Sequence, residues 1–78
     1  MYIINFAVRT PRQTFGKRLR AVREEQNISQ EKLAEMMGGH RNTIGKIERG
    51  ETNFTFDYVV EIARALKVRP SVFFDFVP

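Results

Sequence analysis

Residues 29–50 read SQEKLAEMMGGHRNTIGKIERG, a segment that predicts two short helices joined by a glycine turn. Ser29 is a typical N-cap for the first helix, and Glu31 lies in its first turn, where an acidic side chain suits the helix dipole. Gly38 permits the left-handed backbone conformation that ends a helix. The inner face of this first helix is expected to consist of Leu33, Ala34 and Met37.

The second helix of the pair is expected over residues 41–49, with Gly50 after its end. Ile44 and Ile47 are expected to bury one side of it, while its other side stays polar. The small residue Ala34 lets the two helices cross closely. Two short helices in this arrangement, the second presenting polar side chains outward, are typical of a helix-turn-helix that enters the major groove of DNA.

Upstream, Thr10-Pro11-Arg12-Gln13 predicts the start of another helix. It has a threonine cap, a proline at the first helical position and a glutamine three residues after the cap. We expect this helix to run to about Gln26 and Ile28 to turn back into the core. Its apolar stripe recurs at helical spacing and consists of Phe15, Leu19 and Val22.

Downstream, Thr55 is expected to cap a fourth helix and Pro70 to open a last short helical turn. The apolar face of the fourth helix is expected to contain Phe56, Val59, Val60, Ala63 and Leu66. The apolar residues of the final turn are Val72, Phe73, Phe74 and Phe76. The predicted fold class is therefore all-α, with five short helices forming one domain over residues 10–78.

Residues 1–9 form an apolar arm ahead of that domain. Between residues 2 and 8 the side chains alternate with the period of two that favours a short strand or an extended arm. In one interpretation the arm lies across the core of its own domain. In the other it is a strand that pairs with its copy in a dimer, because a lone strand needs a partner for its backbone.

The composition supports one small domain with one core. The 78 residues are 42% hydrophobic and include seven Phe. Thirteen Lys and Arg against nine Asp and Glu give a net charge of +4, which favours an anionic partner such as DNA, although an ordinary solubilising surface has the same balance. No apolar run reaches the ~20 residues of a membrane span, and residues 1–8 lack the basic start and cleavage site of a signal peptide. We therefore expect a cytoplasmic protein.

The sequence offers little to catalysis or to cofactors. It contains no Cys and one His, which excludes disulfides and thiolate metal sites and removes most other metal-ligand arrangements. No Ser/His/acid or Cys/His set is available, and Gly38-Gly39 lacks the following Lys and Ser or Thr of a P-loop. We expect a protein that is not an enzyme and holds no cofactor.

The spacing within the helix pair carries a family resemblance. Counted from Gln30 as the first position, the small residue is fifth, the glycine ninth and the two isoleucines fifteenth and eighteenth. With these positions the segment resembles the phage repressor and Cro family of XRE-type regulators, which implies a λ-repressor-like domain. The resemblance covers residues 14–74, and further phrases in the style of the family are FGKRLR from Phe15, SQEKLA from Ser29 and IERG from Ile47.

Within that family, Arg41–Gly45 and Arg49–Thr55 look most like the small controller proteins of restriction–modification systems. One departure is Gly39, because the family usually has an apolar residue there. A second glycine costs conformational entropy and forgoes a core contact, so we expect a looser entry to the second helix of the pair.

The resemblance implies a sequence-specific transcriptional regulator that binds double-stranded DNA with residues 41–49 in the major groove. It implies base contacts from Arg41, Asn42, Thr43 and Lys46. It implies phosphate contacts from Ser29, Gln30, His40, Asn53 and Thr55. A salt bridge between Arg23 and Glu48 is also implied, and it would set the angle of the recognition helix. Gly45, in the middle of that helix, is either a point of close approach to the DNA backbone or simply a tolerated residue.

One such domain contacts only a few base pairs, so the resemblance implies a homodimer on a palindromic operator. Candidate interface residues are Phe73, Phe74 and Phe76, although these rings would equally serve to close the core. An alternative function is an antitoxin that binds a toxin protein through the apolar arm or these rings and represses its own operon.

Overall fold

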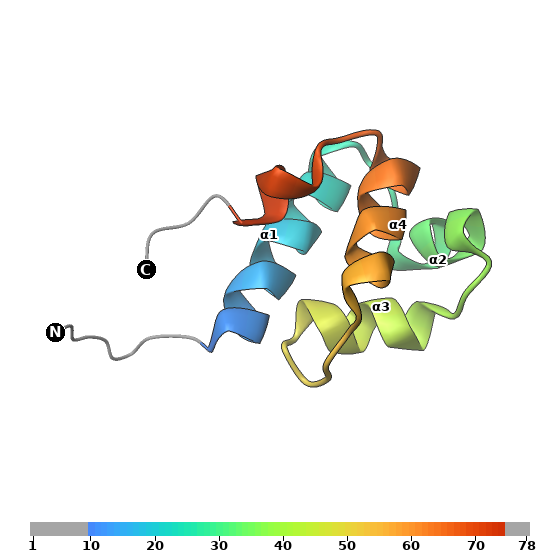
Figure 1. The fold of residues 1–78 in the computed structure, drawn as a ribbon. Coiled ribbons are helices and arrows are strands. Elements are labelled where there is room, and N and C mark those ends of the chain that lie inside the picture. Colours follow the sequence, from blue (N-terminus) through green and yellow to red (C-terminus); the bar gives the residue numbers. More distant parts are fainter. Residues whose placement is uncertain (1–9, 75–78) are drawn as a thin grey trace, which may run out of the picture.

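The computed structural model describes residues 10–74, and its regular elements are all helical (Figure 1). They are α1 (Pro11–Glu25), α2 (Gln30–Met37), α3 (Arg41–Glu48), α4 (Phe56–Leu66) and the 3-10 helix η1 (Pro70–Phe74). The all-α prediction is confirmed, but the count of five helices is corrected to four α-helices and one short 3-10 helix. The five residues that begin with Pro70 form the tighter turns of a 3-10 helix. The apolar arm of residues 1–9, and Phe76, lie outside the described residues.

The predicted helix starts are confirmed by their hydrogen bonds. Thr10 and Gln13 form a capping box, in which the Gln13 N–H donates to Thr10 Oγ1 at 3.2 Å and the Thr10 N–H donates to Gln13 Oε1 at 2.9 Å. Ser29 caps α2 and Thr55 caps α4 in the same way, each accepting a backbone N–H of the first turn. Short polar side chains at these positions satisfy donors that the helix itself leaves unpaired.

The turn between α2 and α3 follows from Gly38, which has φ +72° and so occupies the left-handed region. Its N–H donates to Glu35 O at 3.1 Å, and the N–H of Gly39 donates to Ala34 O at 2.8 Å. A Cβ added to Gly39 would meet only the Tyr58 hydroxyl oxygen, at 3.9 Å. The second glycine therefore leaves space beside the turn, while the turn itself is closed by backbone hydrogen bonds.

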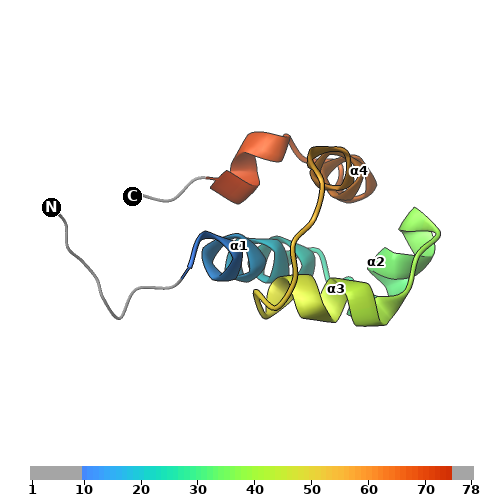
Figure 2. The same ribbon diagram turned by 60° about the horizontal axis from the view of Figure 1, so that its bottom comes forward.

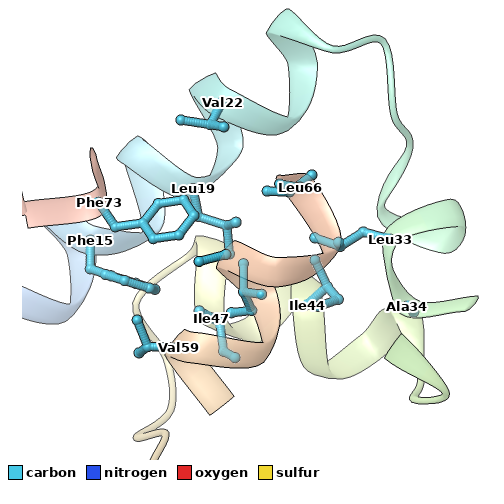
Figure 3. Close-up of a cluster of buried hydrophobic side chains, with 12 residues drawn as sticks. Phe15, Leu19, Val22, Leu33, Ala34, Ile44, Ile47, Val59, Leu66 and Phe73 are labelled. Carbon is cyan, nitrogen blue, oxygen red and sulfur yellow. The ribbon is translucent and has the colours of Figure 1, made fainter. Parts of the chain in front are cut away.

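The core takes side chains from all four α-helices and from η1 (Figure 3). Two predictions about α4 are wrong. Phe56 is 79% exposed and Val60 is only half-buried and outside the core cluster, whereas Ile62, which was not among the expected core residues, is fully buried. Side chains in a helix lean toward its N-terminus, so the first residue of α4 projects beyond the core. Ile62 instead lies between Val59 and Leu66 on the buried face.

The fold holds α3 along one edge of the molecule, where α1 and α2 both pack against it (Figure 2). Gly16 allows α1 to come close, since a Cβ at this position would overlap the carbonyl oxygens of Ile47 and Glu48. On the far side of the core, η1 is tied to α1 by Arg18, whose guanidinium donates to Val72 O at 2.9 and 3.1 Å. The described part of the chain thus exposes one side of α3 and fixes the other.

Candidate nucleic-acid interface

The outer side of α3 brings together the four residues expected to contact bases. Arg41, Asn42, Thr43 and Lys46 are all exposed. On the opposite side Ile44 and Ile47 are buried, with 0% and 1% of their surface exposed. The helix therefore presents a polar face whose backbone is fixed from behind by apolar packing.

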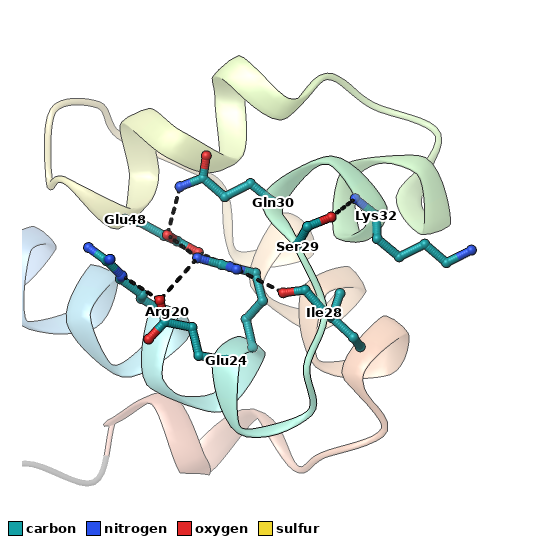
Figure 4. A network of polar contacts seen from close by, with 8 residues as sticks. Arg20, Glu24, Ile28, Ser29, Gln30, Lys32 and Glu48 are labelled. Atoms are coloured by element: carbon teal, nitrogen blue, oxygen red, sulfur yellow. Dashed lines mark hydrogen bonds and ion pairs between the residues drawn. The ribbon is translucent and has the colours of Figure 1, made fainter.

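Arg23 and Glu48 fix the C-terminal end of α3 to α1. Arg23 Nε lies 2.6 Å from Glu48 Oε2, and Arg23 Nη2 donates to Glu48 Oε1 at 3.0 Å. The two side chains are only 8% and 3% exposed. Arg23 also donates to Ile28 O at 2.7 Å, which holds the segment between α1 and α2 (Figure 4). A planar guanidinium matches a carboxylate with two parallel hydrogen bonds, so this pair restrains the angle of α3.

Gln30, the first residue of α2, joins the same network, because its Nε2 donates to Glu48 Oε1 at 2.9 Å (Figure 4). The Glu48 carboxylate thus accepts hydrogen bonds from Arg23 of α1 and from Gln30 of α2. This arrangement couples the start of α2, an expected phosphate contact, to the helix that carries the expected base contacts.

The remaining expected phosphate contacts all lie at helix starts or beside one. Ser29 and Thr55 use their oxygen atoms as acceptors in their N-caps, which leaves each hydroxyl hydrogen free for an outside acceptor. His40 is the N-cap residue of α3 and makes no side-chain capping bond. Asn53 Oδ1 accepts from Arg12 Nη1 at 3.4 Å. All four side chains are exposed.

One residue on this face was missed by the sequence reasoning, which treated Arg49 only as the end of α3. Its guanidinium pairs with Glu51, with Nε 2.9 Å from Oε2, and the hydrogen bond lowers the pKa of the Glu51 carboxyl. Arg49 borders a hollow between the start of α2 and α3 whose lining is Gln30, Arg41, Asn42, Gly45, Lys46 and Arg49. Three cations and no carboxylate line it. Helical spacing could have predicted this position, because residues four and seven apart share one face of a helix. Arg49 follows Gly45 by four residues and Asn42 by seven.

The aromatic residues expected at a dimer interface separate into two kinds. Phe73 is completely buried, with its ring centroid 5.4 Å from that of Phe15, so it is a core residue and its assignment to the interface is wrong. Phe74 is 52% exposed, although its ring also packs on Phe15 at 5.5 Å. It borders an open hollow with Val68 and Val72. Of the two described rings, only Phe74 offers surface to a second molecule.

The helices of residues 10–74 include none that is both long and apolar enough to cross a bilayer.

Comparison with known proteins places the described helices in context. The helix-turn-helix family matches residues 19–73. The control protein C.BamHI of Bacillus amyloliquefaciens is 42% identical over 66 residues, which cover 83% of this chain and 82% of that protein. The solved structure of the restriction–modification controller protein C.AhdI from Aeromonas hydrophila is similar with a TM-score of 0.77 and 35% identity, over 80% of this chain and 94% of that one. A further similar structure is the controller protein C.Esp1396I, a tetramer in complex with its natural 35-base-pair operator. It has a TM-score of 0.76 and 28% identity, over 87% of this chain and 90% of that one.

Proposed function

The chain belongs to the helix-turn-helix family of XRE-type regulators, and on that premise we propose that it is a sequence-specific transcriptional regulator of the restriction–modification controller type. It binds double-stranded operator DNA with α3 in the major groove. The observation that carries this proposal is the exposed polar face of α3, held from behind by Ile44, Ile47 and the Arg23–Glu48 pair. A recognition helix needs both properties, because its side chains must reach bases while its own angle stays fixed.

Two residues on this face have side chains suited to reading particular bases. We assign to Arg41 two hydrogen bonds to O6 and N7 of guanine, and to Asn42 a pair of hydrogen bonds to N6 and N7 of adenine. Both lie in the first turn of α3, and the N-terminal residues of a recognition helix are those that reach base edges. Thr43 and Lys46 complete the contact face. Ser29, Gln30, His40, Asn53 and Thr55 bind phosphates on either side and set the register on the duplex.

Arg41→Ala is expected to weaken binding to the preferred operator by about 1–3 kcal/mol and to relax the preference at one base pair of each half-site. Titration of a labelled operator and of its single-base variants measures both effects. Arg64→Ala is the matched control, because it removes the same charge from an exposed position on α4. An equal loss on every base variant would place Arg41 on a phosphate and contradict its role as a base reader.

The regulator acts as a dimer whose two recognition helices meet half-sites about 34–36 Å apart. The C.Esp1396I structure, a tetramer on its operator, supports assembly on DNA for this chain. Phe74 and the adjacent apolar residues Val68 and Val72 form the dimer surface, because Phe74 exposes half of a large ring at the end of the described chain. A large apolar side chain that one molecule leaves uncovered is a favourable anchor for a second copy.

Phe74→Glu is expected to convert the protein to a monomer at micromolar concentration, since it would bury two carboxylates in an apolar contact. Sedimentation equilibrium measures the effect, and the melting temperature reports any loss of packing on Phe15. Phe56→Glu is the control, because it makes the same change at a more exposed ring. Phe56 is the first residue of α4, whereas Phe74 lies in η1, which follows the last residue of α4. A Phe74→Glu variant that still sediments as a dimer would rule this surface out.

The names of the similar proteins help to decide between the controller function and the alternative antitoxin function. They are named control proteins, which favours a controller over an antitoxin. We assign the protein no catalytic activity and no cofactor, and we place its action in the cytoplasm, where the DNA of a bacterial cell is found.

A further inference from the structure

The hollow between α2 and α3 exists because residue 45 has no side chain. Asn42, Gly45 and Arg49 follow one another at helical spacing along α3, and Gly45 is buried whereas the other two residues are exposed. A Cβ built on Gly45 would lie 3.1 Å from Arg49 Nη1, closer than side chains ordinarily pack, and 3.4 Å from Gln30 Oε1, which is van der Waals contact. The side chains of Arg49 and Gln30 thus form two walls, and the bare backbone of Gly45 forms the floor.

The charge on this hollow suits an anion. Arg41, Lys46 and Arg49 border it, and no carboxylate does. It opens on the same side as the side chains proposed to read bases. The anion that reaches this face in the proposed complex is the phosphodiester backbone of the DNA.

Arg49, which lines the hollow, is restrained there by a weak partner. Both partners of its ion pair with Glu51 are exposed to solvent, the arginine side chain to 57% and the glutamate side chain to 52%. Exposed pairs of this kind add little net stability, because water solvates both charges well. The guanidinium can therefore change partners at small cost when a phosphate approaches.

We propose that this hollow seats one backbone phosphate in each half-site of the operator, and that Arg49 exchanges Glu51 for that phosphate. The inference rests on the proposed function. A phosphate is favoured over a base because Arg49 lies at the C-terminal end of α3, whereas the N-terminal residues of a recognition helix reach base edges. Glycine at position 45 lets the DNA backbone approach the helix at this point. Arg49 and Gly45 become DNA-contact residues, and Glu51 competes with the DNA for Arg49.

Replacing single phosphates of the selected operator by uncharged methylphosphonates tests the contact directly. At one position in each half-site the wild-type protein is expected to lose about tenfold in affinity, while Arg49→Ala loses no more than about twofold. Arg49→Ala should also lower the slope of log affinity against log salt by about two for a dimer, which loses one phosphate contact per subunit. Arg64→Ala should leave both measurements at their wild-type values.

Gly45→Ala separates folding from binding, because the two effects are expected to have opposite signs. Alanine is a better helix former than glycine and the flexible Arg49 side chain can move aside, so the melting temperature should rise. The added methyl group fills the floor of the hollow, so the affinity for the operator should fall about tenfold. A variant that melts higher and binds DNA as well as the wild type would overturn the close approach at Gly45.

Glu51→Gln tests the exchange of partners. It is expected to raise the affinity several-fold in the wild-type background and to change it little when Arg49 is already alanine. An equal gain in both backgrounds would mean that Glu51 only repels DNA, and the exchange would be wrong. If the wild-type protein binds its operator and Arg49→Ala matches it at every phosphate, this inference fails while the proposed function stands. If the wild type selects no operator at all, the proposed function itself fails.

Discussion

Glu48→Ala is expected to lower the free energy of unfolding by about 3–5 kcal/mol, because it leaves the buried Arg23 guanidinium without its carboxylate. Arg23 would keep its hydrogen bond to Ile28 O at 2.7 Å and a longer contact, 4.0 Å, with the exposed Glu24 carboxylate. Gln30 would lose the acceptor of its amide as well. A loss of this size is a large share of the stability of so small a domain. Urea unfolding followed by circular dichroism measures it.

A double variant, Arg23→Met with Glu48→Leu, distinguishes charge burial from general disruption of the core. Replacing both partners of a buried ion pair with apolar side chains often costs little, whereas removing one partner leaves an unpaired charge. We therefore expect the double variant to be more stable than Glu48→Ala alone. Its affinity for operator DNA should nevertheless fall, because the pair also fixes the angle of α3. A Glu48→Ala protein with the wild-type free energy of unfolding would show that the pair is not structural.

Gly16→Ala is expected to destabilise the fold by about 3 kcal/mol, because the new methyl group would overlap the backbone of α3. The overlapping atoms are the carbonyl oxygens of Ile47 and Glu48, which belong to a helix packed into the core through Ile44 and Ile47. The closest approach of α1 and α3 would have to widen. Since Arg23 reaches Glu48 across the same contact, the ion pair would lengthen too. The free energy of unfolding and the affinity for DNA should therefore fall together.

Gly39→Ala is the control for that substitution. A Cβ at Gly39 would touch only the Tyr58 hydroxyl, at 3.9 Å, so the fold should tolerate it. Thermal melts of the two variants under one set of conditions make the comparison. If Gly16→Ala is as stable as Gly39→Ala, then the close approach of α1 to α3 does not depend on glycine.

Features set by neighbouring residues could be predicted from the sequence. The N-caps at Thr10, Ser29 and Thr55 and the left-handed turn at Gly38 follow from short-range rules of hydrogen bonding and backbone sterics. The buried isoleucines of α3 follow from helical periodicity. Together these patterns indicated the helix pair and the polar face of its second helix.

Features set by packing between distant segments could not be predicted in the same way. Phe56 fits the apolar stripe of α4 but lies beyond the edge of the core, and only the position of α4 on its neighbours reveals this. Phe73 and Phe74 are adjacent and chemically identical, and the orientation of η1 alone decides which ring is buried. The hollow beside Arg49 also depends on two segments, since Gln30 of α2 forms one of its walls.

In the proposed function, α3 reads DNA sequence as part of a dimer. Selection of preferred sites from random duplex DNA near physiological salt tests it most directly. We expect enrichment of a palindrome whose half-sites are centred about 10 base pairs apart, so that they face the same side of the duplex. Weak, salt-sensitive retention of all sequences alike would contradict it, because contacts to phosphates alone carry no base preference.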